Sequence, residues 1–111
     1  MTGPQPRNHE IDLATAAAMT GRHRAGATVQ GTRKAEEGAL GGLFAAEQVQ
    51  KLLAQGGAKY LRFYYGRNEK GARELVLVAA DANGNDITSL TLDGHWPCPP
   101  YCPETFSALR G

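Results

Sequence analysis

The sequence predicts a small α+β domain in which an antiparallel meander of three or four strands packs against two helices, with a proline-rich C-terminal tail. Two β-forming runs lie close together, KYLRFYY at 59–65 and RELVLVAA at 73–80. The segment between them, 66–71, holds an asparagine and two glycines, which are typical of a hairpin loop. Two segments with the apolar spacing of helices precede these runs. Helices followed by a hairpin-linked sheet indicate the α+β class.

The first helix is expected to begin after Asp12, a residue type that caps helix N-termini, and to end near Arg24. Basic residues at 22–24 would then complement the dipole at its C-terminus. Its inward face is narrow and consists of Leu13, Ala16, Ala17 and Thr20. Because most of these side chains are small, the helix is expected to lie close against something flat, such as a sheet.

The second helix is predicted at about 47–55, with a buried face formed by Val49, Leu52 and Leu53. The glycine pair at 56–57 supplies the left-handed conformation that ends many helices. Between the two helices, residues 26–42 contain five glycines and predict a loop. A short strand at 40–44 is expected to close that loop.

The strongest strand signal is the apolar run at 75–80, which is apolar on both faces and predicts a central strand covered on both sides. The dipeptide Asn83–Gly84 predicts a tight turn after it, and 87–92 is expected to form the third strand of the meander. The tail at 97–103 is rich in proline.

A chain of 111 residues has room for one domain, so we expect a flexible leader at 1–10 and a single α+β domain at 11–111. The formal net charge of +1 gives no strong overall field to attract nucleic acid or an anionic membrane. No window approaches the eighteen or so apolar residues of a membrane span, and the stretch at 14–19 is too short for a signal sequence. We therefore expect a cytoplasmic protein without membrane association.

Three motifs carry a resemblance: LRFYYG at 61–66, LVLVAADANGNDI at 75–87 and CPPYC at 98–102. In combination they resemble a group of small uncharacterised bacterial proteins of the Bacteroidetes type. The resemblance extends over most of the chain from residue 11 to residue 103. It implies a compact, recurring domain, and it transfers no catalytic or binding residues.

The tail holds the best chemical candidates, Cys98 and Cys102 with His95 nearby. Thiolate and imidazole ligands suit zinc, with a fourth ligand from elsewhere in the chain or from a second copy. The spacing is C-x3-C rather than the C-x2-C of zinc knuckles, and the chain has no other cysteine. We therefore treat zinc as the one metal that these residues could hold, and otherwise expect no cofactor.

The same cysteines permit two other interpretations. A turn centred on residues 100–101 would bring Cys98 and Cys102 within disulfide distance. Alternatively, both pack as small hydrophobic residues beneath a stiff tail anchored by Trp96 and Tyr101. All three interpretations stay open at the level of sequence.

The aromatic run at 59–65 has one face formed by Tyr60, Arg62 and Tyr64. These side chains could stack on single-stranded nucleic acid or contact a protein partner. The run lacks the surrounding basic charge of an RNA-binding sheet, so we do not expect nucleic acid as the main partner. Packing on a helix through one face is the simpler interpretation.

No serine lies in a nucleophile-elbow setting, and no carboxylate pair stands out as a general acid and base. We therefore expect a non-catalytic protein-interaction or structural module that binds a protein partner or forms a homo-oligomer. A thiol- or metal-binding protein is the alternative, and single-stranded nucleic-acid binding is the third hypothesis. The candidate interaction residues are Tyr60, Arg62, Tyr64, Trp96 and Tyr101.

Overall fold

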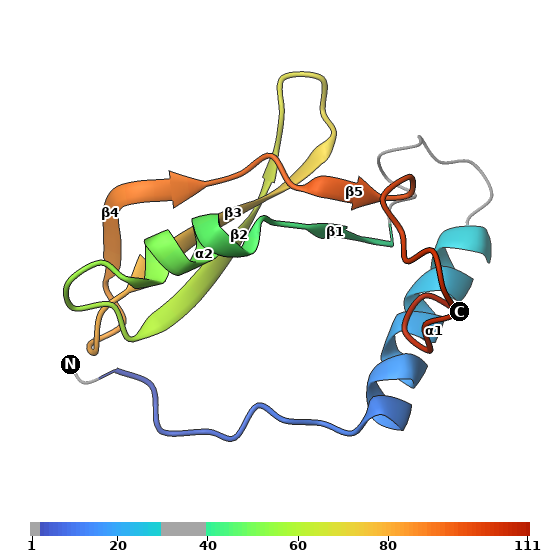
Figure 1. The fold of residues 1–111 in the computed structure, drawn as a ribbon, viewed down its shortest axis with the longest axis horizontal. Helices are drawn as coiled ribbons and strands as arrows, with labels where there is room; N and C mark the ends of the chain where they lie inside the picture. The colour runs from blue at the N-terminus through green and yellow to red at the C-terminus, as the bar shows by residue number, and fades with distance from the viewer. Residues whose placement is uncertain (1–2, 30–39) are drawn as a thin grey trace. The chain divides into compact units, whose positions relative to one another are not determined.

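A computed structural model describes residues 3–29 and 40–111 (Figure 1). In chain order its elements are α1 (Leu13–Val29), β1 (Gly41–Leu43), α2 (Ala46–Leu53), β2 (Tyr60–Arg67), β3 (Arg73–Ala80), β4 (Asp86–Leu92) and β5 (Trp96–Cys98). Helices and antiparallel sheets occur together, which confirms the predicted α+β class.

The chain divides into two compact units. The first, here called the sheet unit, comprises Met1–Arg7 and Phe44–His95. The second, here called the ribbon unit, comprises Asn8–Leu43 and Trp96–Gly111. The expectation of a flexible leader followed by a single domain stays a prediction.

The sheet unit is built on a three-stranded antiparallel meander in the order β2-β3-β4. The β2–β3 register is regular and runs from Tyr60 opposite Ala80 to Arg67 opposite Arg73. The β3–β4 register shifts once, between Val78 and Ala79. The predicted central strand is therefore confirmed as β3, and β2 and β4 form the two edges of this sheet.

The core of the sheet unit forms where α2 lies on β3 and β4. Leu52 is fully buried and packs against Leu77 and Ala79 of the central strand. Half-buried apolar side chains surround this cluster: Phe44, Val49, Ala58, Ile87, Leu90 and Leu92. The prediction for Leu53 is wrong, since 41% of that residue is exposed. It follows Leu52 by one residue, and about 100° of helical rotation turns it away from the sheet.

The end of α2 is fixed by glycine and by contacts of one side chain. Gly57 has a φ of +87°, the left-handed conformation predicted for the helix stop. Gln55 donates a hydrogen bond from Nε2 to the Leu52 carbonyl at 2.8 Å. Its Oε1 accepts one from the Ser89 hydroxyl at 2.7 Å, so the helix end is linked to β4.

Short polar side chains cap both hairpin loops. Asn68 Oδ1 accepts hydrogen bonds from two backbone N–H groups of the β2–β3 loop, at 2.9 and 3.0 Å. Asp81 Oδ1 accepts two in the β3–β4 loop, both at 2.9 Å. Gly84 supplies the positive φ of +84° that this second turn requires. Both predicted turns are confirmed, and β2 extends two residues further than predicted.

In the ribbon unit, α1 begins at the predicted cap, where Asp12 Oδ1 accepts a hydrogen bond from the Thr15 N–H at 2.7 Å. The predicted end near Arg24 is wrong, because the helix continues to Val29. The prediction of a loop at 26–42 is therefore wrong for residues 26–29, which belong to the helix. Residues 30–39 lie outside the described part of the chain. The basic residues at 22–24 lie within the helix rather than at its C-terminus.

A long-range contact also holds α1 near its predicted end. Arg24 donates a hydrogen bond from Nη1 to the Leu109 carbonyl at 2.9 Å, which ties α1 to the C-terminal segment of the same unit. Such tertiary contacts routinely override the weak local preference of glycines such as Gly21 and Gly26. Packing of α1 against a sheet stays a prediction.

The ribbon unit also holds a two-stranded antiparallel ribbon of β1 and β5. Gly41 lies opposite Cys98, and Leu43 lies opposite Trp96. The Leu40 N–H donates to the Cys98 carbonyl at 2.6 Å and extends the ladder. The strand predicted at 40–44 is confirmed, whereas the strand β5, which overlaps the proline-rich tail, was not predicted. Among the residues described, no helix is long and apolar enough to span a bilayer.

We expect Leu52→Ala to lower the free energy of unfolding by about 2–5 kcal/mol, because it leaves a cavity beneath α2. Leu53→Ala is the matched control, since it removes the same atoms from an exposed position of the same helix and should cost less than about 1 kcal/mol. Urea unfolding followed by circular dichroism measures both values. Similar losses in the two variants would contradict the packing described for α2.

Candidate interaction surface and disulfide

Strand β2 presents two rows of side chains, one on each face of the sheet. The row formed by Leu61, Phe63 and Tyr65, here called the apolar row, pairs across the ladder with Leu75, Leu77 and Ala79. It therefore shares the face on which α2 packs, but α2 contacts β3 and β4. The three residues of the row are 46%, 53% and 85% exposed. The rings of Phe63 and Tyr65 lie edge to face with centroids 5.5 Å apart.

The opposite row contains the predicted candidates Tyr60, Arg62 and Tyr64, and two of them meet at Asp86. Arg62 Nη1 lies 2.5 Å from Asp86 Oδ1, and the Tyr64 hydroxyl donates to Asp86 Oδ2 at 2.5 Å. Arg62 Nη1 also donates to the Gly84 carbonyl at 3.0 Å. Asp86 begins β4, so this cluster links the two edge strands across β3.

The Asp86 cluster changes the proton affinity of each member. The hydrogen bond from Tyr64, and then the contacts with Arg62, lower the pKa of the Asp86 carboxyl. The same hydrogen bond, followed by burial, raises the pKa of Tyr64. The hydrogen bond to Asp86, together with its negative charge, raises the pKa of Arg62. The cluster is therefore most stable with a carboxylate, a guanidinium and a neutral phenol.

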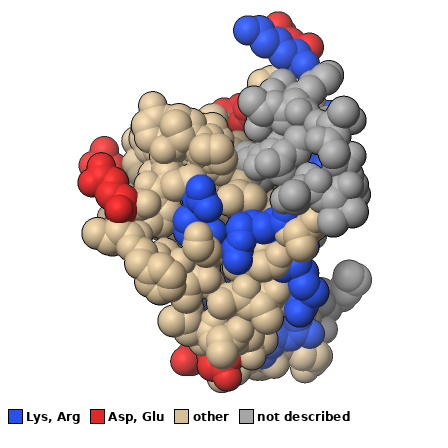
Figure 2. Space-filling model, turned by 90° about the vertical axis from the view of Figure 1, so that its right-hand side faces the viewer, with Lys and Arg blue, Asp and Glu red and all other residues tan. Residues whose placement is uncertain are grey.

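These contacts bear on the nucleic-acid hypothesis. Arg62, the cation of the predicted stacking row, is paired with a carboxylate, and such pairing reduces its attraction for phosphate. Figure 2 shows Lys and Arg as well as Asp and Glu side chains exposed in one space-filling view. The assignment of Tyr60, Arg62 and Tyr64 to an interaction surface stays a prediction.

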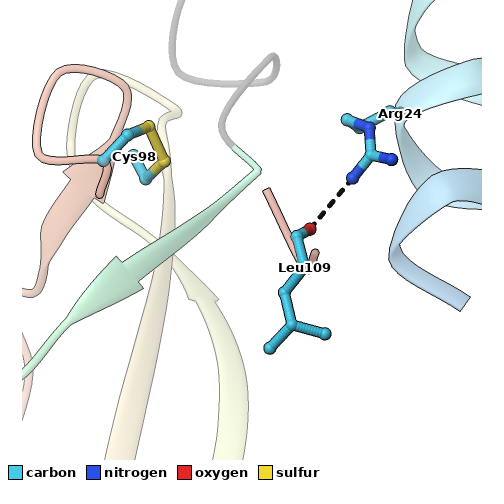
Figure 3. The surroundings of a disulfide bond; sticks show 4 residues. Arg24, Cys98 and Leu109 are labelled. Atoms are coloured by element: carbon cyan, nitrogen blue, oxygen red, sulfur yellow. Dashed lines mark hydrogen bonds between the residues drawn. A yellow bond between two sulfur atoms is a disulfide. The ribbon is translucent and has the colours of Figure 1, made fainter. Parts of the chain in front are cut away.

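Cys98 and Cys102 form a disulfide (Figure 3). Their Cα atoms lie 4.7 Å apart, and the Tyr101 N–H donates to the Pro97 carbonyl at 2.9 Å across the loop between them. Of the three interpretations of the cysteine pair, the disulfide is the one present in the structure. Structural disulfides are typical of oxidising compartments. The predicted cytoplasmic location stays a prediction.

The proposed third metal ligand, His95, has other neighbours. Its Nδ1 lies 3.4 Å from Glu74 Oε1 without the geometry of a hydrogen bond, and both atoms are buried. Its ring lies 6.1 Å from that of Phe44. Because a disulfide supplies no thiolates, the zinc ligand set predicted from Cys98 and Cys102 is not formed. The described residues contain no group of three His, Cys, Asp or Glu side chains that could hold a metal ion.

The other two candidates, Trp96 and Tyr101, are both exposed in the ribbon unit. Neither is buried as an anchor beneath the tail, but both remain available for the predicted contact with a partner. Sequence reasoning missed Asp86 and Glu74 as neighbours of candidate residues. The start of the third strand directly after an Asn-Gly turn was the signal that could have placed Asp86 beside the central strand, one strand away from the aromatic strand.

We expect Asp86→Asn to destabilise the protein at neutral pH and to have progressively less effect as the pH falls. The folded-state pKa of Asp86 lies below its unfolded value, so its contribution is present above about pH 4 and is lost as the pH falls through the folded pKa. Urea midpoints of the variant and the wild type should therefore converge toward acid pH. Asp93→Asn, an exposed carboxylate just after β4, is the control. A constant difference between variant and wild type at every pH would contradict the ionic role of Asp86.

Replacing both cysteines with serine should lower the free energy of unfolding of the ribbon unit by about 2 kcal/mol. This value is at the low end of the range for disulfides, because the closed loop is short. This corresponds to roughly 30-fold faster hydrogen exchange at the Tyr101 amide, which bonds across the loop. The Asn68 amide in the β2–β3 hairpin is the internal control. Unchanged exchange at Tyr101 would show that the bridge does not hold this loop.

Comparisons of the chain with protein-family models, with curated proteins and with solved structures find no match. The resemblance to small Bacteroidetes-type proteins therefore stays a prediction.

Proposed function

We propose that this chain is a non-catalytic protein-interaction module whose binding surface is the apolar row of β2 with the adjoining backbone edge. The observation that carries the proposal is the exposure of this row, in particular Phe63 at 53% and Tyr65 at 85%. Contiguous exposed apolar side chains on a sheet are characteristic of interaction sites. Aromatic residues are also enriched where proteins meet, because they bury a large area with few rotatable bonds.

The rigidity of β2 supports this function. Its ladder to β3 is regular over eight pairs, and the Asp86 cluster holds the opposite face of the strand to β4. The apolar row is therefore presented on a fixed scaffold, so a partner does not have to order it. The row lies next to the α2-covered core without contributing to the core cluster.

A pair of phenylalanine variants tests the module. Immobilised wild-type protein should capture one or more specific proteins from a lysate of the source cells, and Phe63→Glu should abolish that capture. Phe106→Glu is the matched control, because Phe106 is also exposed but belongs to the ribbon unit. Cross-linking from position 65 should locate the captured protein at β2. Equal capture by the two variants, or turnover in a broad substrate screen, would contradict the proposal.

The disulfide favours a second candidate function, a thiol–disulfide protein that acts through Cys98 and Cys102. Cys98 is buried and Cys102 is half-buried, and such limited access slows exchange with other thiols. Titration against glutathione buffers gives the reduction potential of the pair. A potential near that of cellular glutathione would support redox function, and a much lower potential would assign the bridge to structure.

A further inference from the structure

Among the described residues, the backbone of β2 has one edge without a partner strand, and the groups on that edge belong to the apolar row. The Asn68 N–H donates to the Ala72 carbonyl at 2.9 Å, and these residues continue the β2–β3 register. Hydrogen-bonded and non-hydrogen-bonded pairs alternate along an antiparallel ladder. Even-numbered residues of β2 therefore bond to β3, and the N–H and C=O groups of Leu61, Phe63 and Tyr65 point away from it. Within the described residues, β2 pairs with β3 alone.

This edge lacks the features that usually prevent strand addition. Such features are proline, bulges, inward-pointing charges and very short strands. β2 is eight residues long, contains no proline and keeps a regular register. Its central charge, Arg62, is turned to the opposite face and held by Asp86. The irregularity in this sheet occurs instead between β3 and β4.

We propose that a second copy of this chain occupies this edge and pairs antiparallel with β2 about a two-fold axis through Phe63. The inference rests on the proposed function and names the partner of that same surface. In this register Leu61 lies opposite Tyr65 of the second copy, and Phe63 lies opposite itself. All three outward-pointing residues of each strand then form hydrogen-bonded pairs, and the two meanders join into one six-stranded sheet.

The side chains favour this register over its neighbours. With the axis through Phe63, Arg62 faces Tyr64 of the second copy, a pair without like charges. An axis through Arg62 would place two guanidinium groups directly opposite each other, which is destabilising. An axis through Tyr64 would place Leu61 opposite Arg67. The register centred on Phe63 is the one that pairs the apolar row only with itself, although it also places Lys59 opposite Arg67 of the second copy at the ends of the paired strands.

The exposed area sets the expected strength. The rings of Phe63 and Tyr65 together expose about 300 Å², taking about 200 Å² for each whole side chain. Two copies would bury about twice this ring area, with a further contribution from Leu61 and the backbone. This is smaller than the 1,200–2,000 Å² or so of stable interfaces. The dimer should therefore be concentration-dependent, with a Kd on the order of micromolar or weaker.

Sedimentation velocity of the full chain from about 1 μM to about 1 mM tests the proposal, since this range brackets the expected Kd. Wild type and Phe106→Glu should shift from monomer to dimer together. Phe63→Glu should stay monomeric, because the two-fold axis places its carboxylates opposite each other. Amide exchange at Leu61, Phe63 and Tyr65 should slow as the wild-type concentration rises.

A charge-reversal pair tests the register itself. Phe63→Lys alone should also be monomeric, whereas an equimolar mixture of Phe63→Lys and Phe63→Glu should recover dimers, because residue 63 faces residue 63 across the axis. Recovery also demonstrates that both variants are folded. A wild-type monomer at the highest concentration, a dimer that survives Phe63→Glu, or a mixture that stays monomeric would overturn the proposal. The wild type could stay monomeric and still capture a different protein from the lysate, with that capture lost in Phe63→Glu. This result would overturn the proposed dimer but would support the interaction module.

Discussion

The antiparallel register between β2 and β3 is the constraint on which the other features of the sheet unit depend. Side chains alternate between the two faces, so this register decides which residues lie near α2 and which meet Asp86. A slip of one residue would turn Phe63 toward the carboxylate and Arg62 toward the apolar face. Asn68 fixes the hairpin loop through its two backbone hydrogen bonds, and the contact of Arg62 with Asp86 ties the same register to β4.

Features with a local cause could be predicted from the sequence, whereas features set by distant contacts could not. The central strand follows from an uninterrupted apolar run, and both turns follow from asparagine, aspartate and glycine at the required positions. The end of α1 was predicted wrongly, since the helix continues past Arg24 to Val29. The contact of Arg24 with Leu109, 85 residues further along the chain, lies outside any local pattern. The predicted burial of Leu53 is wrong, because the sequence of a short helix with adjacent leucines does not reveal which of them faces the sheet.

For the candidate site, too, local features could be predicted from the sequence and long-range contacts could not. Alternation along β2 assigned its residues to two rows, but exposure depends on where α2 lies, and α2 covers β3 and β4 rather than β2. The row marked by charge and hydroxyl groups, with Arg62 and Tyr64, proved to be bound to Asp86 of the same chain. For the cysteines, spacing alone left a metal site, a bridge and simple packing open. The choice depends on a turn of the backbone that brings Cys98 and Cys102 together.

The apolar row exposes apolar surface to water, which is unfavourable for solubility unless a partner covers it. The core cluster around Leu52 consists of side chains from α2, β3, β4 and adjoining segments, so the packing described for this unit does not require rings on β2. A lysine at Tyr65 would preserve the strand and protect its edge from association with other chains. Instead the chain keeps a ring that is 85% exposed, beside backbone groups that have no partner strand in the described part of the chain. Residues that packing does not require, and that solubility opposes, are those for which binding gives the most direct physical explanation.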